Sequence, residues 1–226
     1  MDISLNFIEK GTGDILILLH GNGESNKYFI HQIDFFSSRY KVIAIDTRGH
    51  GESLRGDAPF TLDQFAEDLH NFMLEQKIRK ANILGFSDGG NIALLFALKY
   101  PDHFSKLILN GANLNPEGVK RFYQLPIILA YKLLVKIADR NPKAIKNAEM
   151  LGLMVNEPNI DPDCLKNLSI PTLVIAGTND MIKQEHTKLI ASKIPNAKLI
   201  FIKGTHIIAY QKPSEFNKAV NLFLQE

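Results

Sequence analysis

Residues 85–90 have the sequence GFSDGG, and their first two residues end the short apolar run NILGF of residues 82–86. A helix-like stretch begins at Gly89, so the polar side chain of Ser87 lies where a strand leads into a helix. Glycine-rich turns join strands to helices throughout α/β proteins, and one interpretation of the hexapeptide is therefore a plain turn. The other interpretation is that Ser87 is a nucleophile. The rest of the chain has to decide between them.

The remainder of the chain alternates short apolar runs with longer amphipathic stretches. Short runs that are apolar throughout are typical of strands buried on both faces, as in a parallel sheet. This alternation predicts the α/β class, with a doubly wound, mainly parallel sheet and right-handed crossovers. The expected strands are residues 15–19, 41–45, 82–86, 106–110, 172–176 and 198–202.

Helices are predicted between these strands. One begins at Thr61, which forms a potential capping box with Gln64, and its apolar side chains then share one face. A second covers residues 89–100, and a third follows Pro213.

The segment between Asn110 and Thr172 contains no strand candidate, although connections between strands are usually far shorter. Helical patterns at 117–139 and 142–155 indicate a small helical insertion over one edge of the sheet. We therefore expect a single domain overall. Its α/β core would comprise residues 1–110 and 170–226, and residues 111–169 would form a small helical cap inserted in that core.

Composition places the chain among ordinary globular proteins. Of its 226 residues, 45% are hydrophobic and 22% charged, and the net charge of +2 gives no indication of a nucleic-acid partner. The N-terminal residues lack the apolar core of a signal peptide. The most apolar helical candidate, Leu125 to Ala138, is short and interrupted by lysines, so no stable membrane insertion is expected. Cys164 is the only cysteine, which excludes an internal disulfide and favours a reducing, cytoplasmic location.

The stretch from Gly85 to Gly89 matches the pattern G-x-S-x-G, with a strand before it and a helix after it, as the pattern requires. In this arrangement Ser87 would occupy a tight, strained turn at the carboxyl end of the sheet. Glycine neighbours are needed there because backbones approach closely. The helix that follows would direct free N–H groups and the positive end of its dipole at a reacting carbonyl.

A serine hydroxyl needs a base, and the base needs an orienting acid. The strand 172–176 is followed by GTND, which ends in Asp180, and the strand 198–202 is followed by KGTH, which ends in His206. Taken singly, such an Asp is often a helix cap and such a His is often a surface or core residue. However, all three residues follow strand ends, and the ends of parallel strands meet in one crevice. Their order along the chain, Ser, Asp, His, favours nucleophilic catalysis.

The strand 15–19 leads into HGNG, residues 20–23, a turn able to direct a backbone N–H at the nucleophile. Together with the N–H of Asp88, this turn would supply two donors to an oxyanion. Such donors commonly contribute about 3 kcal/mol each to transition-state stabilisation. We interpret His20 as a structural residue that holds the loop by hydrogen bonding.

These motifs resemble the α/β-hydrolase superfamily of serine hydrolases over nearly the whole chain. The stretch DTRGHGES of residues 46–53 is similar to a structural loop of that family, so Arg48 and His50 are assigned no catalytic role. Many members begin with a two-strand hairpin, but only about a dozen residues precede the turn at 11–13. We therefore expect the first strand to be missing or vestigial.

The resemblance implies Ser87 as the nucleophile, His206 as the base and Asp180 as the acid. It also implies the backbone N–H groups of Asn22 and Asp88 as the oxyanion donors. The expected reaction is cleavage of a small carboxylic ester, as in a carboxylesterase, without a metal or organic cofactor. Amides, thioesters and lactones pass through the same intermediate and stay open as substrates. A member of the fold that binds a small ligand without turnover is the alternative of another class.

Four side chains are candidate substrate contacts, and Asp88 is the unusual one. A carboxylate about 7 Å from an oxyanion would oppose it by about 2 kcal/mol at an effective dielectric constant of about 20. Asp88 is then a helix-end charge, a partner of a protein Lys or Arg, or a partner of an ammonium group on the substrate. The last alternative favours α-amino-acid esters. The other candidate contacts are Phe86, Leu125 and Leu129.

Residues 118–148 of the expected cap are strongly basic. One interpretation is attraction of anionic substrates or of a lipid surface. The interpretation we favour is a solvated helix face whose apolar opposite side packs over the pocket. That apolar side would consist of Leu125, Ile128, Leu129, Leu133 and Ile137. The basic residues are Lys120, Arg121, Lys132, Lys136, Arg140, Lys143 and Lys146, against the single acid Asp139.

Overall fold

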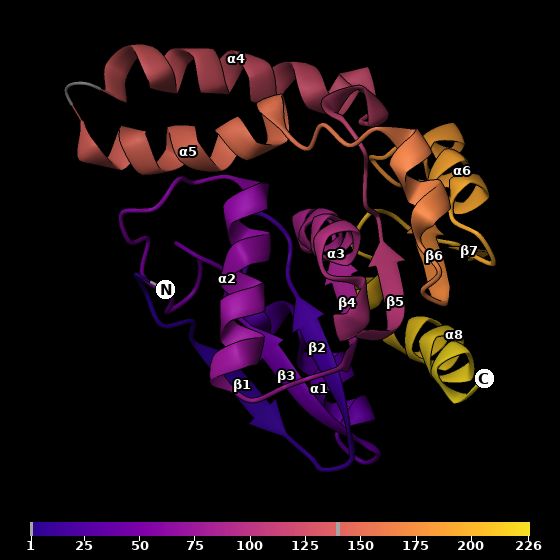
Figure 1. Cartoon of the computed structure of the whole chain (residues 1–226). Helices are drawn as coiled ribbons and strands as arrows, with labels where there is room; N and C mark the ends of the chain where they lie inside the picture. The colour runs from indigo at the N-terminus through magenta and orange to yellow at the C-terminus, as the bar shows by residue number, and fades with distance from the viewer. Residues whose placement is uncertain (1, 139–140) are drawn as a thin grey trace.

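A seven-stranded sheet with the order β1-β3-β2-β4-β5-β6-β7 organises the chain (Figure 1). In this computed structural model, residues 2–138 and 141–226 are described. All neighbouring strands are parallel except the pair of β1 and β3. The expected α/β class with a mainly parallel sheet is therefore confirmed. The strands are β1 (Phe7–Lys10), β2 (Asp14–Leu19), β3 (Tyr40–Ile45), β4 (Ala81–Phe86), β5 (Phe104–Asn110), β6 (Thr172–Gly177) and β7 (Lys198–Ile202).

Strand β1 decides between the two alternatives expected for the first strand: it is present, but it is short. Its four residues pair antiparallel with β3, from Phe7 opposite Ile45 to Lys10 opposite Val42. Only Phe7 is partly buried and the next three residues are exposed, as befits a short edge strand. Four residues with one partly buried side chain give too little hydrophobic pattern to predict a strand.

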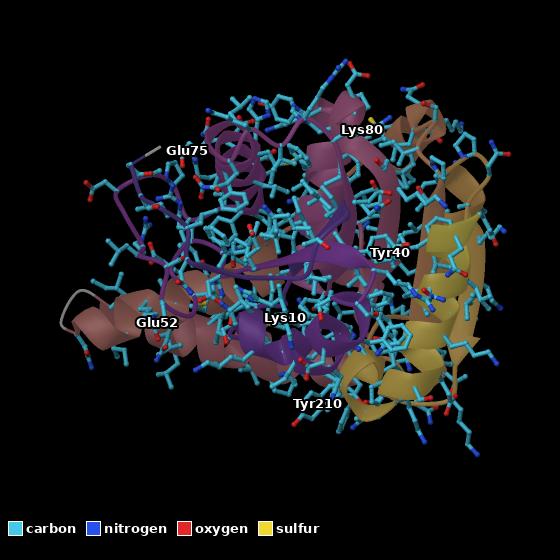
Figure 2. All side chains as sticks on the ribbon, turned by 90° about the horizontal axis from the view of Figure 1, so that it is seen from below. Lys10, Tyr40, Glu52, Glu75, Lys80 and Tyr210 are labelled. Carbon is cyan, nitrogen blue, oxygen red and sulfur yellow. The ribbon has the colours of Figure 1, made fainter. Side chains whose placement is uncertain are left out.

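Helices cover both faces of the sheet. Alternate strand residues point to opposite faces, so that Ile17 and Ile43 join one apolar cluster while Leu16 and Val42 join the other. Figure 2 shows these two layers from below, with Tyr210 and the C-terminal helix on the side away from α2. The first face carries α2 (Leu62–Glu75), α3 (Asp88–Lys99) and α6 (Gln184–Lys193), and the second carries α1 (Ile30–Phe36), α7 (Ile208–Gln211) and α8 (Pro213–Gln225).

The predicted start of α2 is confirmed in part. Thr61 accepts a hydrogen bond from the backbone N–H of Gln64 at 3.2 Å, which caps the helix. The side chain of Gln64 instead donates to Asp68 at 3.1 Å, so only half of the capping box forms.

Strand β7 differs from the expectation of burial on both faces. It is the last strand of the sheet, and Lys198 and Leu199 at its start are exposed. Only Ile202, next to the loop that carries His206, is fully buried. An apolar run predicts a strand, but it does not indicate whether that strand lies inside the sheet or at its edge.

The loop after β3 is structural, as the sequence predicts. Its Arg48 is fully buried and pairs with Asp68 at 2.7 Å and with Asp2 at 2.6 Å. Asp46 is also buried and accepts hydrogen bonds from the backbone N–H groups of Asn26 and Glu52. These bonds connect the start of the chain with the loops that follow β2 and β3.

Two long helices, α4 (Arg121–Ala138) and α5 (Pro142–Asn156), follow β5 before the chain returns to β6. They lie side by side above the carboxyl ends of the strands, with α5 nearer the sheet (Figure 1). The segment also holds two short 3-10 helices, η3 (Pro116–Gly118) and η4 (Pro162–Asn167). Two other 3-10 helices, η1 (Asn26–Phe29) and η2 (Pro101–His103), precede β5 in the chain.

The apolar side of α4 does not pack over the pocket, so that expectation is wrong. Four of its five residues, Leu125, Leu129, Leu133 and Ile137, are exposed, and Ile128 is only partly buried. Gln124 is the one buried residue described in this helix. The helix rests on α5 through its other side, and the amphipathic pattern alone could not say which side faces the protein. Asp139 and Arg140 of the basic segment lie outside the described residues, as does the side chain of Lys143. Within the part of the chain that the structure describes, no helix has the length and hydropathy needed to cross a membrane.

Candidate active site

Ser87 lies at the junction of β4 and α3 with a left-handed backbone, at φ 52° and ψ −120°. Its N–H donates to the carbonyl of Asn110 on the neighbouring strand at 2.8 Å, which holds the turn against the sheet. A residue other than glycine rarely adopts this conformation, and such strain is concentrated at functional sites. The turn therefore projects the Ser87 hydroxyl from the carboxyl end of the sheet.

At two positions around this turn only glycine fits, because neighbouring backbone atoms leave no room for a Cβ atom. A Cβ on Gly85 would lie 2.2 Å from the carbonyl oxygen of Gly89, and a Cβ on Gly89 would lie 2.0 Å from that of Leu19. Both distances are far below any real contact. The glycines of GFSDGG thus let α3 begin directly against β2 and β4.

The structure brings Ser87, His206 and Asp180 together from three strand ends. The Nε2 atom of His206 lies 2.9 Å from Ser87 Oγ, and its Nδ1 atom lies 2.6 Å from Asp180 Oδ1. With the Nδ1 proton donated to the carboxylate, Nε2 is left as an acceptor for the serine hydroxyl. The chain can thus pass a proton from the hydroxyl to an oriented imidazole.

Asp180 is almost completely buried, and its Oδ1 also accepts from the N–H of Ile182 at 2.9 Å. Two residues that sequence reasoning missed surround this pair. Lys120 donates through Nζ to the carbonyl of Asp180 at 2.6 Å, and a Cβ on Gly111 would lie 2.8 Å from the His206 ring. Gly111 directly follows the β5 strand end, which is a signal that could have identified it. In the sequence, Lys120 stands out only as one of the basic residues of the expected cap.

The HGNG loop lies against the serine. A Cβ on Gly21 would be 3.2 Å from Ser87 Cβ, so this loop is in contact with the turn. The backbone N–H of Asp88, the first residue of α3, has no acceptor within the helix. Asn22 uses its side chain to bind α5, donating from Nδ2 to the carbonyl of Met150 at 2.7 Å. The roles of Asn22 and Asp88 as oxyanion donors stay predictions.

The carboxyl group of Asp88 is buried beneath α5. Its Oδ1 accepts from Asn91 at 3.2 Å, whereas its Oδ2 has no hydrogen-bond partner among the described residues. No ion pair found in the described ranges includes Asp88. Burial raises the pKa of this carboxyl to about 6, although the nearby side chains of Asn22 and Asn91 act to lower it. Pairing with a protein Lys or Arg therefore does not explain this residue.

Sequence reasoning also missed Glu24 and Tyr28, which follow the HGNG loop. The Tyr28 ring stacks on Phe86 with centroids 4.3 Å apart, and Phe86 in turn lies 4.8 Å from the His206 ring. Burial raises the pKa of the Glu24 carboxyl to about 7, and nearby His206 lowers it. Glu24 Oε2 and the Tyr28 hydroxyl are both buried without a hydrogen-bond partner among the described residues. Proximity of Glu24 to HGNG was the only available signal.

The four candidate substrate contacts separate in the structure. Phe86 and Asp88 flank the serine, but Leu125 lines a different hollow, of about 420 Å³, between the start of α4 and Lys183. Neither Ser87 nor His206 lines that hollow. Leu129 is 60% exposed and does not line it either. Leu129 therefore lies on the exposed side of α4, outside this hollow.

His20 acts as a structural residue, as expected. It is buried, its Nε2 accepts from the N–H of Thr47 at 3.1 Å, and its Nδ1 lies 2.7 Å from the carbonyl of Gly21. Burial lowers its pKa to about 4, so the ring is neutral at physiological pH. His50 also lies in this buried network, through Thr47 and the carbonyl of Arg48. No group of three or more His, Cys, Asp or Glu in the described ranges is arranged to hold a metal ion.

Known proteins share this architecture. The alpha/beta hydrolase fold family matches residues 14–151, more than half of the chain. Human serine hydrolase BPHL is 27% identical, over 99% of this chain and 84% of the human protein. The 3-oxoadipate enol-lactonase 2 of Acinetobacter baylyi is 25% identical, over 99% of this chain and 94% of its own length. A thermophilic esterase from Thermogutta terrifontis superposes with a TM-score of 0.78 at 25% identity, over 99% of this chain and 93% of that one.

Proposed function

The chain belongs to the alpha/beta hydrolase fold family, and we propose that it is a serine hydrolase that cleaves small carboxylic esters through an acyl-enzyme. The observation that carries this proposal is the hydrogen-bonded series from Ser87 through His206 to Asp180. Esterases and lactonases among the similar proteins support this class of reaction.

In the proposed reaction, Ser87 Oγ attacks the ester carbonyl carbon while its proton passes to His206 Nε2. The carbonyl electron pair moves to the oxygen, forming a tetrahedral oxyanion. When this intermediate collapses, the alcohol leaves with the proton from His206. Water then attacks the acyl group and gives a proton to His206, and Ser87 recovers that proton as the acid is released.

Asp180 would hold the imidazole in the tautomer that this reaction needs and stabilise it while it carries the extra proton. The oxyanion would be bound by the backbone N–H groups of Asn22 and Asp88. Contact of the HGNG loop with Ser87 and the free N–H at the start of α3 support that assignment.

Residues 111–169 act as a cap over this site in our proposal, and the core comprises residues 1–110 and 170–226. The hydrogen bond from Asn22 to Met150 of α5 supports this division, because it links the proposed oxyanion loop directly to the helix above it. Arg55 and Glu149 form a second link, an ion pair of 2.5 Å.

Asp88 supports a preference for esters that carry an ammonium group near the carbonyl, such as α-amino-acid esters. One oxygen of its buried carboxyl has no hydrogen-bond partner, and the carboxyl is in none of the ion pairs found among the described residues. A cationic substrate would satisfy both. Matched esters with and without the α-amino group, assayed at pH 8, measure this preference as a ratio of kcat/KM. Asp88→Asn should lower that ratio several-fold and leave turnover of neutral esters unchanged or higher. An equal ratio in both proteins would reduce Asp88 to a helix-end charge.

Lactones are the second candidate substrates, because an enol-lactonase is among the similar proteins. Amides and thioesters use the same intermediate. A panel of p-nitrophenyl esters of different chain length, compared with lactones, thioesters and amides, would rank these classes by kcat/KM.

Labelling by a fluorophosphonate tests whether the chain is an enzyme at all. The probe should label the wild type and Ser192→Ala, a control at an exposed serine, but not Ser87→Ala. A ligand-binding protein of this fold would label weakly or not at all in every form, and that result would reject the proposed function.

A further inference from the structure

Helix α4 leaves its apolar side chains in solvent. Phe122 is 84% exposed, Leu133 is 62% exposed, and Leu129 and Ile137 are exposed as well. Monomeric soluble proteins seldom leave large apolar side chains together in this way, and a contiguous apolar surface usually marks a binding site. No other described part of the chain covers this face.

The exposed face divides lengthwise into two rows. At 100° per residue, one half of the face is entirely apolar, and the other half is mainly basic. The apolar row consists of Phe122, Pro126, Leu129, Ala130, Leu133 and Ile137, and the basic row contains Arg121, Lys132 and Lys136 beside Leu125, all exposed.

Charge on this helix has one sign. Residues 121–138 contain no Asp or Glu, and Lys146 on α5 adds a further exposed basic side chain. An amphipathic helix with a large apolar row beside Lys and Arg is the pattern of a helix that lies in a membrane interface. The basic row would bind lipid phosphates while the apolar row enters the boundary between headgroups and acyl chains.

We propose that the outer face of α4 docks on the surface of an anionic phospholipid bilayer. A second copy of this chain is the other obvious occupant, but pairing one α4 with another would give the basic row no acidic partner, because residues 121–138 contain no Asp or Glu. The missing negative charge favours an anionic surface over a second copy as the occupant. Because α5 lies between α4 and the strand ends (Figure 1), docking does not require any movement of Ser87 or His206.

The test is co-sedimentation of the full chain with vesicles of phosphatidylcholine alone or of phosphatidylcholine and phosphatidylglycerol. The protein should sediment with the mixed vesicles and much less with the neutral ones, and added salt should weaken the binding. Lys132→Gln/Lys136→Gln should weaken it roughly ten-fold or more, since each lysine near an anionic surface contributes about a five-fold factor. Phe122→Ser/Leu133→Ser should abolish it.

Two matched controls distinguish binding through this face from non-specific adsorption of the protein to vesicles. Leu54→Ser/Leu74→Ser removes exposed leucines outside α4, and Lys188→Gln/Lys218→Gln removes two exposed lysines elsewhere. Both controls should bind like the wild type. Circular dichroism and turnover of a water-soluble ester confirm that each variant is folded, and they report the proposed hydrolase activity independently of vesicle binding.

Equal binding by the α4 variants and the controls would overturn the proposal, as would absence of binding by the wild type. Light scattering after size exclusion supplies a further contrary outcome. If the wild type is a dimer that Phe122→Ser/Leu133→Ser converts to a monomer, and vesicles are not bound, the face is an interface between copies of the chain.

Discussion

The strand ends around Ser87 and the outer face of α4 differ in what they bury and what they expose. At the strand ends, polar groups are buried and most are paired, as with Asp180 held by His206 and Ile182. On α4, apolar side chains such as Phe122 face solvent. The difference teaches that the core fixes the position of the polar groups, whereas α4 is held only along the side that rests on α5. Substitutions in the two regions should therefore have very different effects.

The largest expected effect is on turnover, from Asp180→Asn. The amide would present its oxygen or its NH₂ group to His206 with the wrong proton arrangement, as loss of the orienting carboxylate does in triad enzymes. We expect kcat for an ester to fall about 10⁴-fold, with an unfolding midpoint close to that of the wild type. Steady-state kinetics and thermal melts measure the two quantities. A loss of less than ten-fold in a folded variant would remove Asp180 from the proposed site.

The next largest effect contrasts Gly89, at the turn around Ser87, with Gly152 on α5, the helix on which α4 rests. Gly89→Ala places a Cβ 2.0 Å from the Leu19 carbonyl oxygen, and we expect it to lower the free energy of unfolding by about 3 kcal/mol or more. Gly152→Ala on α5 meets nothing closer than 3.4 Å and should stabilise by roughly 0.5–1 kcal/mol through helix propensity. Urea unfolding of both variants tests the contrast. Similar values for the two would show that the turn around Ser87 can relax.

Asp88→Asn should stabilise the protein in a pH-dependent way. Burial raises the pKa of Asp88 from its ordinary value of 3.8 to about 6, so the folded state binds this proton more tightly than the unfolded state. Ionisation therefore reduces stability as the pH rises from 3.8 to about 6, and the penalty is constant above that range. The gain from Asp88→Asn should reach up to about 3 kcal/mol at pH 8 and vanish near pH 3.5. Unfolding free energies of both proteins at several pH values measure this gain. A gain that does not depend on pH would contradict the raised pKa of Asp88.

The smallest effect is expected on α4. Phe122→Ala and Leu133→Ala remove side chains that are largely in solvent, so each should change the free energy of unfolding by under about 0.5 kcal/mol. Leu153→Ala on α5 is the matched control, because Leu153 is buried and its loss should cost about 2–5 kcal/mol. Denaturant midpoints of the three variants measure these costs. A large cost at Phe122 would mean that this face is covered in solution.

Much of the core could be predicted because its signals are local. The six apolar runs predicted six strands, and the helices after Thr61, Ser87 and Pro213 formed as expected. Strand β1 was missed because four residues at an exposed edge carry little hydrophobic pattern. The short helix α1 and helix α6 were not predicted. A cytoplasmic location stays a prediction from the single cysteine.

The sequence by itself determined which residues carry chemistry and where along the chain they lie. A serine between glycines after an apolar strand, with an Asp and a His after later strands, is a local pattern that the parallel sheet gathers at one edge. Tertiary structure alone decided the surroundings of these residues. The approach of Lys120 to Asp180, the burial of Glu24 and the unpartnered oxygen of Asp88 depend on contacts between segments far apart in the chain. The orientation of α4 was also undetermined, because a periodicity of 3.6 residues defines an apolar side and leaves open whether protein or solvent meets it.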